Sequence, residues 1–131
     1  MQEVSIHKES SERYRISLSD ATTIEVNGDE PRSTDLVLAG LAACSARTLG
    51  IVLARMRIDV HDVNLKVSAE RKEEPPRVFT RINMYWAVSS QTTPKAKILR
   101  ALALAESHCT VFNILKAGTE IEVHLDVDAP D

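Results

Sequence analysis

The chain contains few cysteines and few aromatic residues. Its 131 residues include two cysteines, Cys44 and Cys109, and only 4% of them are Phe, Trp or Tyr. Two thiols are too few for the disulfide scaffold of a small secreted domain, so a reactive pair is the better prediction. Stacking surfaces for nucleic-acid bases need several aromatic rings, so we do not expect them here. The core must therefore be built from Leu, Ile, Val and Ala.

The sequence also lacks an excess of positive charge. Its 16 basic and 19 acidic residues give a net charge of −3 at pH 7. A protein that binds nucleic acid neutralises phosphates with a basic patch or stripe, and none is present here. We therefore expect no nucleic-acid partner.

No targeting segment is recognisable. The N-terminal residues alternate between polar and apolar types and lack the apolar centre of a signal peptide. The apolar run 36–54 approaches the length of a membrane span, but Arg47 would lie near the bilayer centre, at a cost of at least about 2.5 kcal/mol. We expect a cytoplasmic protein without a membrane span, in which residues 1–131 form one domain.

Hydrophobic periodicity predicts the elements of the N-terminal half. Apolar residues at every second position predict three antiparallel strands, near residues 4–6, 14–18 and 24–26. The cluster Ser33-Thr34-Asp35 then provides helix N-cap chemistry for a helix that ends near residue 57. Because this helix is apolar on almost every face, we expect it to be central and shielded from solvent.

The C-terminal half alternates strands and helices. Residues 63–67 and 78–88 are predicted to form a long hairpin, and 121–127 a last strand. Between them, Thr93 is the expected N-cap of a helix. That helix either continues through Cys109 or gives way to a short second helix capped by Ser107. The resulting order, βββ-α-ββ-αα-β, is an α+β pattern.

Three segments of the chain carry a resemblance to a known family. They are residues 31–44 (PRSTDLVLAGLAAC), 68–71 (SAER) and 105–115 (AESHCTVFNIL). In this order and spacing they resemble the OsmC/Ohr family of osmotically inducible and organic-hydroperoxide-resistance proteins. The resemblance implies an OsmC-like fold, in which antiparallel sheets wrap around a long central helix in an intertwined homodimer.

The resemblance also implies an activity, that of a thiol peroxidase without a cofactor. The cysteine that corresponds to Cys44 attacks an organic hydroperoxide and becomes a sulfenic acid. The one that corresponds to Cys109 then condenses with it to form a disulfide. This chemistry agrees with the general oxidation pathway of thiolates. A dithiol, for which a lipoyl-bearing partner protein is a candidate, would reduce the disulfide.

The relative acidity of the two thiols is a separate question. If Ser107 caps a short helix, Cys109 lies in its first turn beside His108, a setting that lowers a thiol pKa. Cys44 lies in the middle of a helix, where burial raises the pKa. From local sequence alone, we expect Cys109 to be the more acidic thiol. The family role of Cys44 would then require a nearby cation.

Three residues are candidates to support the thiols. Arg47 shares a helix face with Cys44 and could supply the cation. Ohr enzymes instead carry an arginine in a Gly-rich N-terminal loop and a glutamate ten residues before the first cysteine. Here Asp35 is the nearest acid, so the chain resembles an OsmC-like branch more than a typical Ohr. His108, beside the second cysteine, is the third candidate, and its alternative role is simple capping.

Further cations and other functions stay open at this level. Arg13, Arg15 and Arg32 are alternative sources of positive charge. A metal site from Cys44, Cys109 and histidines has no supporting CxxC or HxxxH spacing, so we expect no metal. The main alternative to a peroxidase is a non-enzymatic OsmC-like binding module, which would hold a small apolar or thiol ligand in a cavity of the dimer.

Overall fold

The computed structural model describes all residues, 1–131, and divides them into two compact units, residues 1–37 and 38–131. The first unit contains the antiparallel sheet β1-β2-β3, with β1 at Ser5–Lys8, β2 at Arg13–Ser17 and β3 at Thr23–Asn27. In its register, Ile16 pairs with Ile6 on one side and Ile24 on the other. The prediction of three antiparallel strands is confirmed.

The N-terminal sheet has no buried core within its own unit. None of residues 1–37 is classed as buried, and Ile6 keeps 61% of its surface exposed. A three-stranded sheet needs a covered apolar face to be stable on its own. The apolar residues of these strands therefore have no covered face within the unit itself.

The second unit contains a three-stranded sheet and most of the helix α1, which spans Ser33–Arg55. The sheet has the order β4-β5-β6, with β4 at Asp62–Arg71, β5 at Phe79–Ser89 and β6 at Glu120–Asp128. Between β5 and β6 the chain forms α2, Lys95–His108, and α3, Thr110–Lys116. The α+β class and the order of elements are as predicted.

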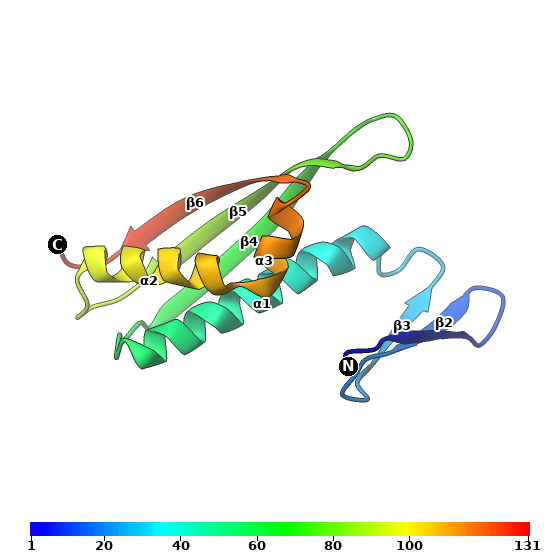
Figure 1. The fold of residues 1–131 in the computed structure, drawn as a ribbon, viewed down its shortest axis with the longest axis horizontal. Coiled ribbons are helices and arrows are strands. Elements are labelled where there is room, and N and C mark those ends of the chain that lie inside the picture. The colour runs from blue at the N-terminus through cyan, green and yellow to red at the C-terminus, as the bar shows by residue number, and fades with distance from the viewer. The chain divides into compact units, whose positions relative to one another are not determined.

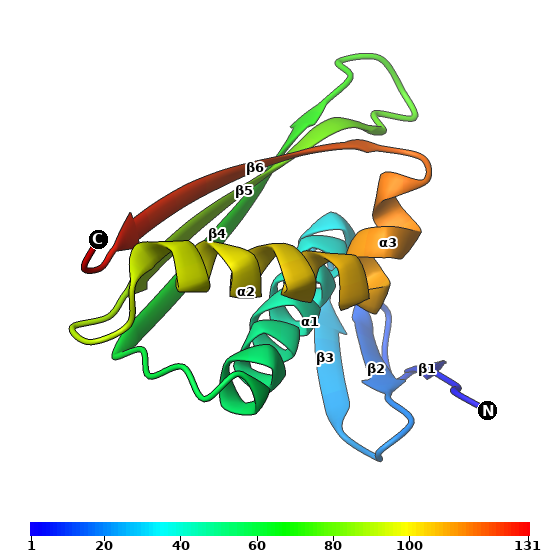
Figure 2. The same cartoon turned by 60° about the vertical axis from the view of Figure 1, so that its left-hand side comes forward.

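One pairing differs from the antiparallel sheets that were expected. The strands β4 and β5 form the predicted antiparallel hairpin, but β6 lies parallel to β5. Two antiparallel strands can be joined by a tight turn, whereas parallel strands need a long crossover connection. Helices α2 and α3 provide that crossover, and Figures 1 and 2 show them on the same side of the sheet as α1.

The core of this unit lies between the sheet and the two longer helices. Alternate residues of β5 point into it, as the two-residue period of a strand requires. One face each of α1 and α2 covers them. The main buried side chains are Leu41, Leu49, Leu53, Ile82, Met84, Trp86, Val88, Ile98 and Leu102.

Helix α1 is only partly shielded from solvent in the single chain, contrary to the prediction. Its buried face is opposed by exposed apolar residues, and Val37 and Ile51 are 43% and 44% exposed. By length and composition α1 could cross a membrane, with a mean hydropathy of 1.9, and so could the pair α2 and α3, which is bent by 68°. Core helices of water-soluble proteins have the same properties, so these alone do not assign α1 to a bilayer.

The ends of α2 and α3 correct two predicted caps. Pro94, rather than Thr93, is the N-cap of α2, and the Thr93 hydroxyl donates to the Asp59 carbonyl instead. Ser107 does not cap α3, because its hydroxyl donates to the Leu104 carbonyl one turn back. The cap of α3 is Cys109 itself, whose extended backbone ends the preceding helix.

Candidate active site

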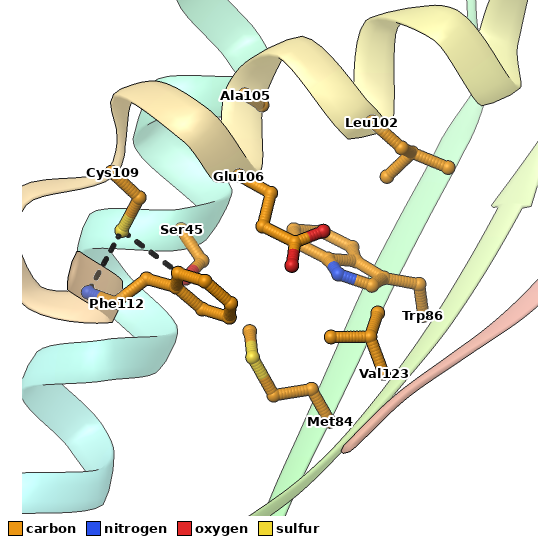
Figure 3. Close-up of a pocket in the computed structure, with 9 residues that line it drawn as sticks. All are labelled: Ser45, Met84, Trp86, Leu102, Ala105, Glu106, Cys109, Phe112 and Val123. Atoms are coloured by element: carbon orange, nitrogen blue, oxygen red, sulfur yellow. Dashed lines mark hydrogen bonds between the residues drawn. The ribbon is translucent and has the colours of Figure 1, made fainter. Parts of the chain in front are cut away.

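Cys109 lies at the junction of α2 and α3, and its side chain is 1% exposed. Its Sγ accepts a hydrogen bond from the Phe112 backbone N–H, at an N···S distance of 3.5 Å. The hydroxyl oxygen of Ser45, on α1, is 3.4 Å from the same sulfur (Figure 3). The second cysteine therefore fixes the start of α3 against the middle of α1.

Cys44 precedes Ser45 on α1 and is half-buried. Its thiol interacts with the Cys109 thiol, with the hydroxyl of Thr48 one helical turn later, and with the backbone N–H groups of Thr110 and Val111. Neither cysteine forms a disulfide in this structure. The fold thus brings together two reduced thiols that are 65 positions apart in the sequence (109 − 44).

The surroundings shift the pKa values of the two thiols in opposite directions. Burial raises the pKa of Cys44, but hydrogen bonds from Val111, Cys109, Thr48 and Thr110 outweigh it, so the pKa is lower than for an ordinary cysteine. For Cys109, burial outweighs the hydrogen bonds from Ser45 and Phe112, and the neighbouring Cys44 adds to it, so the pKa is raised. Cys44 is therefore the more acidic thiol.

This result overturns the expectation that Cys109 is the more acidic cysteine. The first backbone N–H groups of a helix have no acceptor within the helix. In α3 the first two backbone N–H groups, from Thr110 and Val111, interact with the Cys44 sulfur. Only the third, from Phe112, donates to the Cys109 sulfur. The N-terminal end of α3 therefore lowers the pKa of Cys44, although Cys44 lies in the middle of α1.

The three predicted supporting residues occupy exposed positions. Arg47 and His108 lie on α1 and at the end of α2, and neither is among the groups that shift the pKa of Cys44. Asp35 lies in the first turn of α1, within the N-terminal unit. No group of three or more His, Cys, Asp or Glu residues in the chain is arranged to hold a metal.

Sequence reasoning did not identify Ser45 and Thr48 as site residues. Thr48 follows Cys44 by four positions, the spacing that places two residues on one helix face, so this signal was available. Ser45 had no comparable signal, because its contact with Cys109 depends on how α1 packs against the α2 and α3 junction.

The cavity beside Cys109 is small. Its volume is about 10 Å³, which is close to the space that one water molecule occupies. The residues that line it come from both helices and the sheet; they are Ser45, Met84, Trp86, Leu102, Ala105, Glu106, Cys109, Phe112 and Val123 (Figure 3). An organic molecule does not fit there.

Replacing Thr48 by valine should make Cys44 less reactive at neutral pH. The variant removes a hydroxyl that stabilises the thiolate, so the pKa of Cys44 rises and less thiolate is present. A hydrogen bond worth about 1 kcal/mol corresponds to a rate of alkylation by iodoacetamide that is about fivefold lower at pH 7. Mass spectrometry after timed labelling, repeated across pH, measures this rate.

Two control variants make the Thr48 experiment specific. Thr48→Ser keeps the hydroxyl and should label at nearly the parental rate. Arg47→Ala should also leave the rate unchanged, because Arg47 does not contribute to the shift of Cys44. A slow Arg47→Ala protein together with a normal Thr48→Val protein would mean that the arginine, and not the hydroxyl, activates the thiol.

Comparison with known proteins shows the family to which the chain belongs. Residues 26–124 match the family model described as OsmC-like protein. The Protein YhfA of Escherichia coli (strain K12) is 35% identical over 105 residues, which cover 79% of this chain and 78% of that protein. A protein of Mycoplasma pneumoniae named hydroperoxide reductase is 21% identical over 120 residues, with 89% and 83% of the two chains covered.

A solved structure shows the same fold. The OsmC-like protein from Mycoplasma pneumoniae superposes with a TM-score of 0.84 over 98% of this chain and 97% of that one, at 18% sequence identity. Its match extends over both units of the present structure.

Proposed function

Because the chain belongs to the OsmC-like family, we propose that it is a thiol-dependent peroxidase that reduces organic hydroperoxides. The observation that supports this proposal best is the contact between two reduced thiols whose pKa values are shifted in opposite directions. A peroxidase needs one thiolate to attack and a second thiol close enough to complete the disulfide. In this proposal Cys44 attacks and Cys109 resolves.

The reaction has two steps in the protein. The Cys44 thiolate attacks the distal oxygen of the hydroperoxide, the O–O bond breaks, and the leaving alkoxide takes a proton to become an alcohol. Cys44 is then a sulfenic acid. The Cys109 sulfur attacks the Cys44 sulfur, the S–O bond breaks, and water leaves as the disulfide forms. A dithiol then exchanges with this disulfide and restores both thiols.

The environment of Cys109 suits the second of these steps. Because its pKa is raised and that of Cys44 is lowered, Cys44 loses its proton before Cys109 does, and the Cys109 thiol can then donate its hydrogen to the Cys44 sulfur without adding a second negative charge. Once Cys44 is oxidised, its charge no longer raises the pKa of Cys109. Deprotonation of Cys109 then becomes easier at the stage when its nucleophilicity is required.

The proposal extends to the partners of the protein. We include a homodimer, and the absence of a buried core in residues 1–37 supports it, because a second chain could cover that sheet. We also include a dithiol reductant, such as a lipoyl group on another protein, and a cytoplasmic location. The name hydroperoxide reductase of the Mycoplasma pneumoniae relative agrees with the reaction proposed here.

The test is a count of free thiols on the reduced protein, with intact mass, before and after one equivalent of cumene hydroperoxide. We expect both thiols to disappear and each chain to lose two hydrogens, because the disulfide forms within the chain. Two intact thiols after exposure would contradict the peroxidase, and they would favour the alternative of a non-enzymatic binding module.

A further inference from the structure

Cys109 has to carry a negative charge in the second step of the proposed reaction, in a nearly closed environment. Its side chain is 1% exposed, and the cavity beside it, about 10 Å³, has space for one water molecule. Most of the cavity lining is apolar, with Met84, Trp86 and Leu102 among its residues. An anion is costly in such a place unless the protein supplies hydrogen-bond donors. The donors around the Cys109 sulfur therefore decide how readily it becomes a thiolate.

Two groups of the protein can donate hydrogen bonds to this sulfur. The Phe112 backbone N–H donates at an N···S distance of 3.5 Å, and the Ser45 hydroxyl oxygen lies 3.4 Å from the sulfur (Figure 3). Both groups lower the pKa of Cys109, against the larger effect of burial. A thiolate has no hydrogen, so the Ser45 hydroxyl has to be the donor once Cys109 has ionised.

The Ser45 hydroxyl is committed to this contact. Within a helix, a serine side chain commonly bonds to a backbone carbonyl one turn back or points to solvent. Ser45 does neither, because it is 5% exposed and the hydrogen bond of its hydroxyl is with the Cys109 sulfur. Thr48, on the same helix, interacts with Cys44 instead. Helix α1 therefore supplies a separate hydroxyl to each of the two thiols.

Few titratable groups face Cys109. On α1 the titratable neighbour is Cys44, which raises the pKa of Cys109. On α2, Glu106 lines the same cavity but is not among the groups that shift this pKa. The lining residues from α3 and the sheet carry no charge; they are Phe112, Met84, Trp86 and Val123. Oxidation of Cys44 to a neutral sulfenic acid removes its charge, so Ser45 and the backbone N–H remain to favour the Cys109 thiolate.

We propose that Ser45 is a catalytic residue of the second step, whose hydroxyl donates to the Cys109 sulfur while this sulfur attacks the oxidised Cys44. This inference rests on the proposed peroxidase function. In the step, the Cys109 thiol releases its proton to solvent, the thiolate attacks the Cys44 sulfur, and the S–O bond breaks. The hydroxide that leaves takes a proton from solvent and becomes water, so no proton is gained or lost overall. Ser45 touches the reacting sulfur but no atom of the hydroperoxide.

The first experiment measures how the rate of disulfide formation depends on pH in the parent and Ser45→Ala proteins. Losing a hydrogen bond to a charged sulfur should lower the thiolate fraction of Cys109 about tenfold at neutral pH. A less acidic thiol is also the better nucleophile as a thiolate, which offsets this loss by about threefold. Disulfide formation should therefore be about threefold slower at pH 7. The difference should disappear and then reverse as the pH rises past the pKa of Cys109.

Rapid acid quench followed by intact mass separates the two steps. One equivalent of cumene hydroperoxide first makes the chain one oxygen heavier, as the sulfenic acid forms. The disulfide then makes it two hydrogens lighter than the reduced chain. The first step should stay within twofold of the parental rate, because Ser45 is not among the groups that shift the pKa of Cys44.

A second experiment titrates Cys109 without any peroxide. The chain has two cysteines, so Cys44→Ala leaves Cys109 as the only thiol. The ultraviolet absorbance of the thiolate should appear at higher pH when Ser45→Ala is added to Cys44→Ala. Below both midpoints, the double variant should contain about tenfold less thiolate at a given pH.

Ser107→Ala is the matched control, because it removes a hydroxyl two residues before Cys109 that donates to the Leu104 carbonyl. It should change neither measurement by more than twofold. If Ser45→Ala slowed disulfide formation equally at every pH, or left the titration unchanged, the role of Ser45 would be overturned and the peroxidase would stand. If cumene hydroperoxide did not oxidise Cys44 in the parent, the peroxidase itself would be overturned, and the role of Ser45 with it.

Discussion

Replacing Cys44 by serine should lower peroxide turnover by at least about a thousandfold. A serine hydroxyl does not ionise at neutral pH, so the hydrogen bonds from the start of α3 have no anion to stabilise. Cys109 cannot replace Cys44, because burial raises its pKa and it is 1% exposed. Coupled consumption of cumene hydroperoxide with a dithiol reductant measures the rate.

Replacing Cys109 by serine should have a different outcome, which separates the two roles. The Cys44 thiolate still attacks, so the variant should consume about one equivalent of peroxide and then stop. Without a resolving thiol, Cys44 should accumulate as sulfenic acid and, with excess peroxide, as sulfinic acid. Intact mass would show gains of one and then two oxygens. Parental turnover in Cys44→Ser, or a disulfide in Cys109→Ser, would show that the roles are assigned wrongly.

The local elements of the fold could be predicted because their signals are local. The three N-terminal strands and the long hairpin follow from a period of two residues in the apolar pattern, and α1 follows from its N-cap cluster and its long apolar run. The parallel pairing of β6 with β5 depends on the path of the α2 and α3 crossover, which periodicity does not specify. The same holds for the cap of α3, where the Cys109 sulfur, and not the expected Ser107 hydroxyl, accepts the hydrogen bond from the Phe112 backbone N–H.

The candidate site also has features that could be predicted from the sequence and features that could not. The two cysteines and the family resemblance were visible in the sequence, and Thr48 could have been found from its spacing to Cys44. The acidity of the thiols could not, because it depends on backbone N–H groups of Thr110 and Val111, which every residue except proline carries. A side-chain cation such as Arg47 can be recognised in a sequence, whereas the position of a backbone N–H group cannot.

The exposure of α1 has a physical meaning that the sequence alone could not give. The apolar pattern predicted a shielded helix, but within one chain only one face, with Leu41, Leu49 and Leu53, is covered. The remaining apolar residues, Val37 and Ile51 among them, form an exposed apolar surface of the kind that marks interaction sites. The proposed homodimer would account for this surface.

Replacing Leu49 by alanine should destabilise the protein by about 3 kcal/mol, which lies within the range for deletion of a buried leucine side chain. Leu49 is 0% exposed and belongs to the core between α1 and the β4-β5-β6 sheet. The loss combines the transfer of the side chain with the cavity that it leaves. It corresponds to a fall in Tm of roughly 10 °C for a chain of this size.

Ile51→Ala is the matched control for the Leu49 experiment, because the residue lies two positions later on the same helix but is 44% exposed. Deleting its side chain leaves no enclosed cavity, so the loss should stay below about 1 kcal/mol in urea unfolding of the single chain. If Ile51→Ala were as destabilising as Leu49→Ala, and its cost rose with protein concentration, the exposed face of α1 would be buried by a second chain. Equal costs at every concentration would instead contradict the core described here.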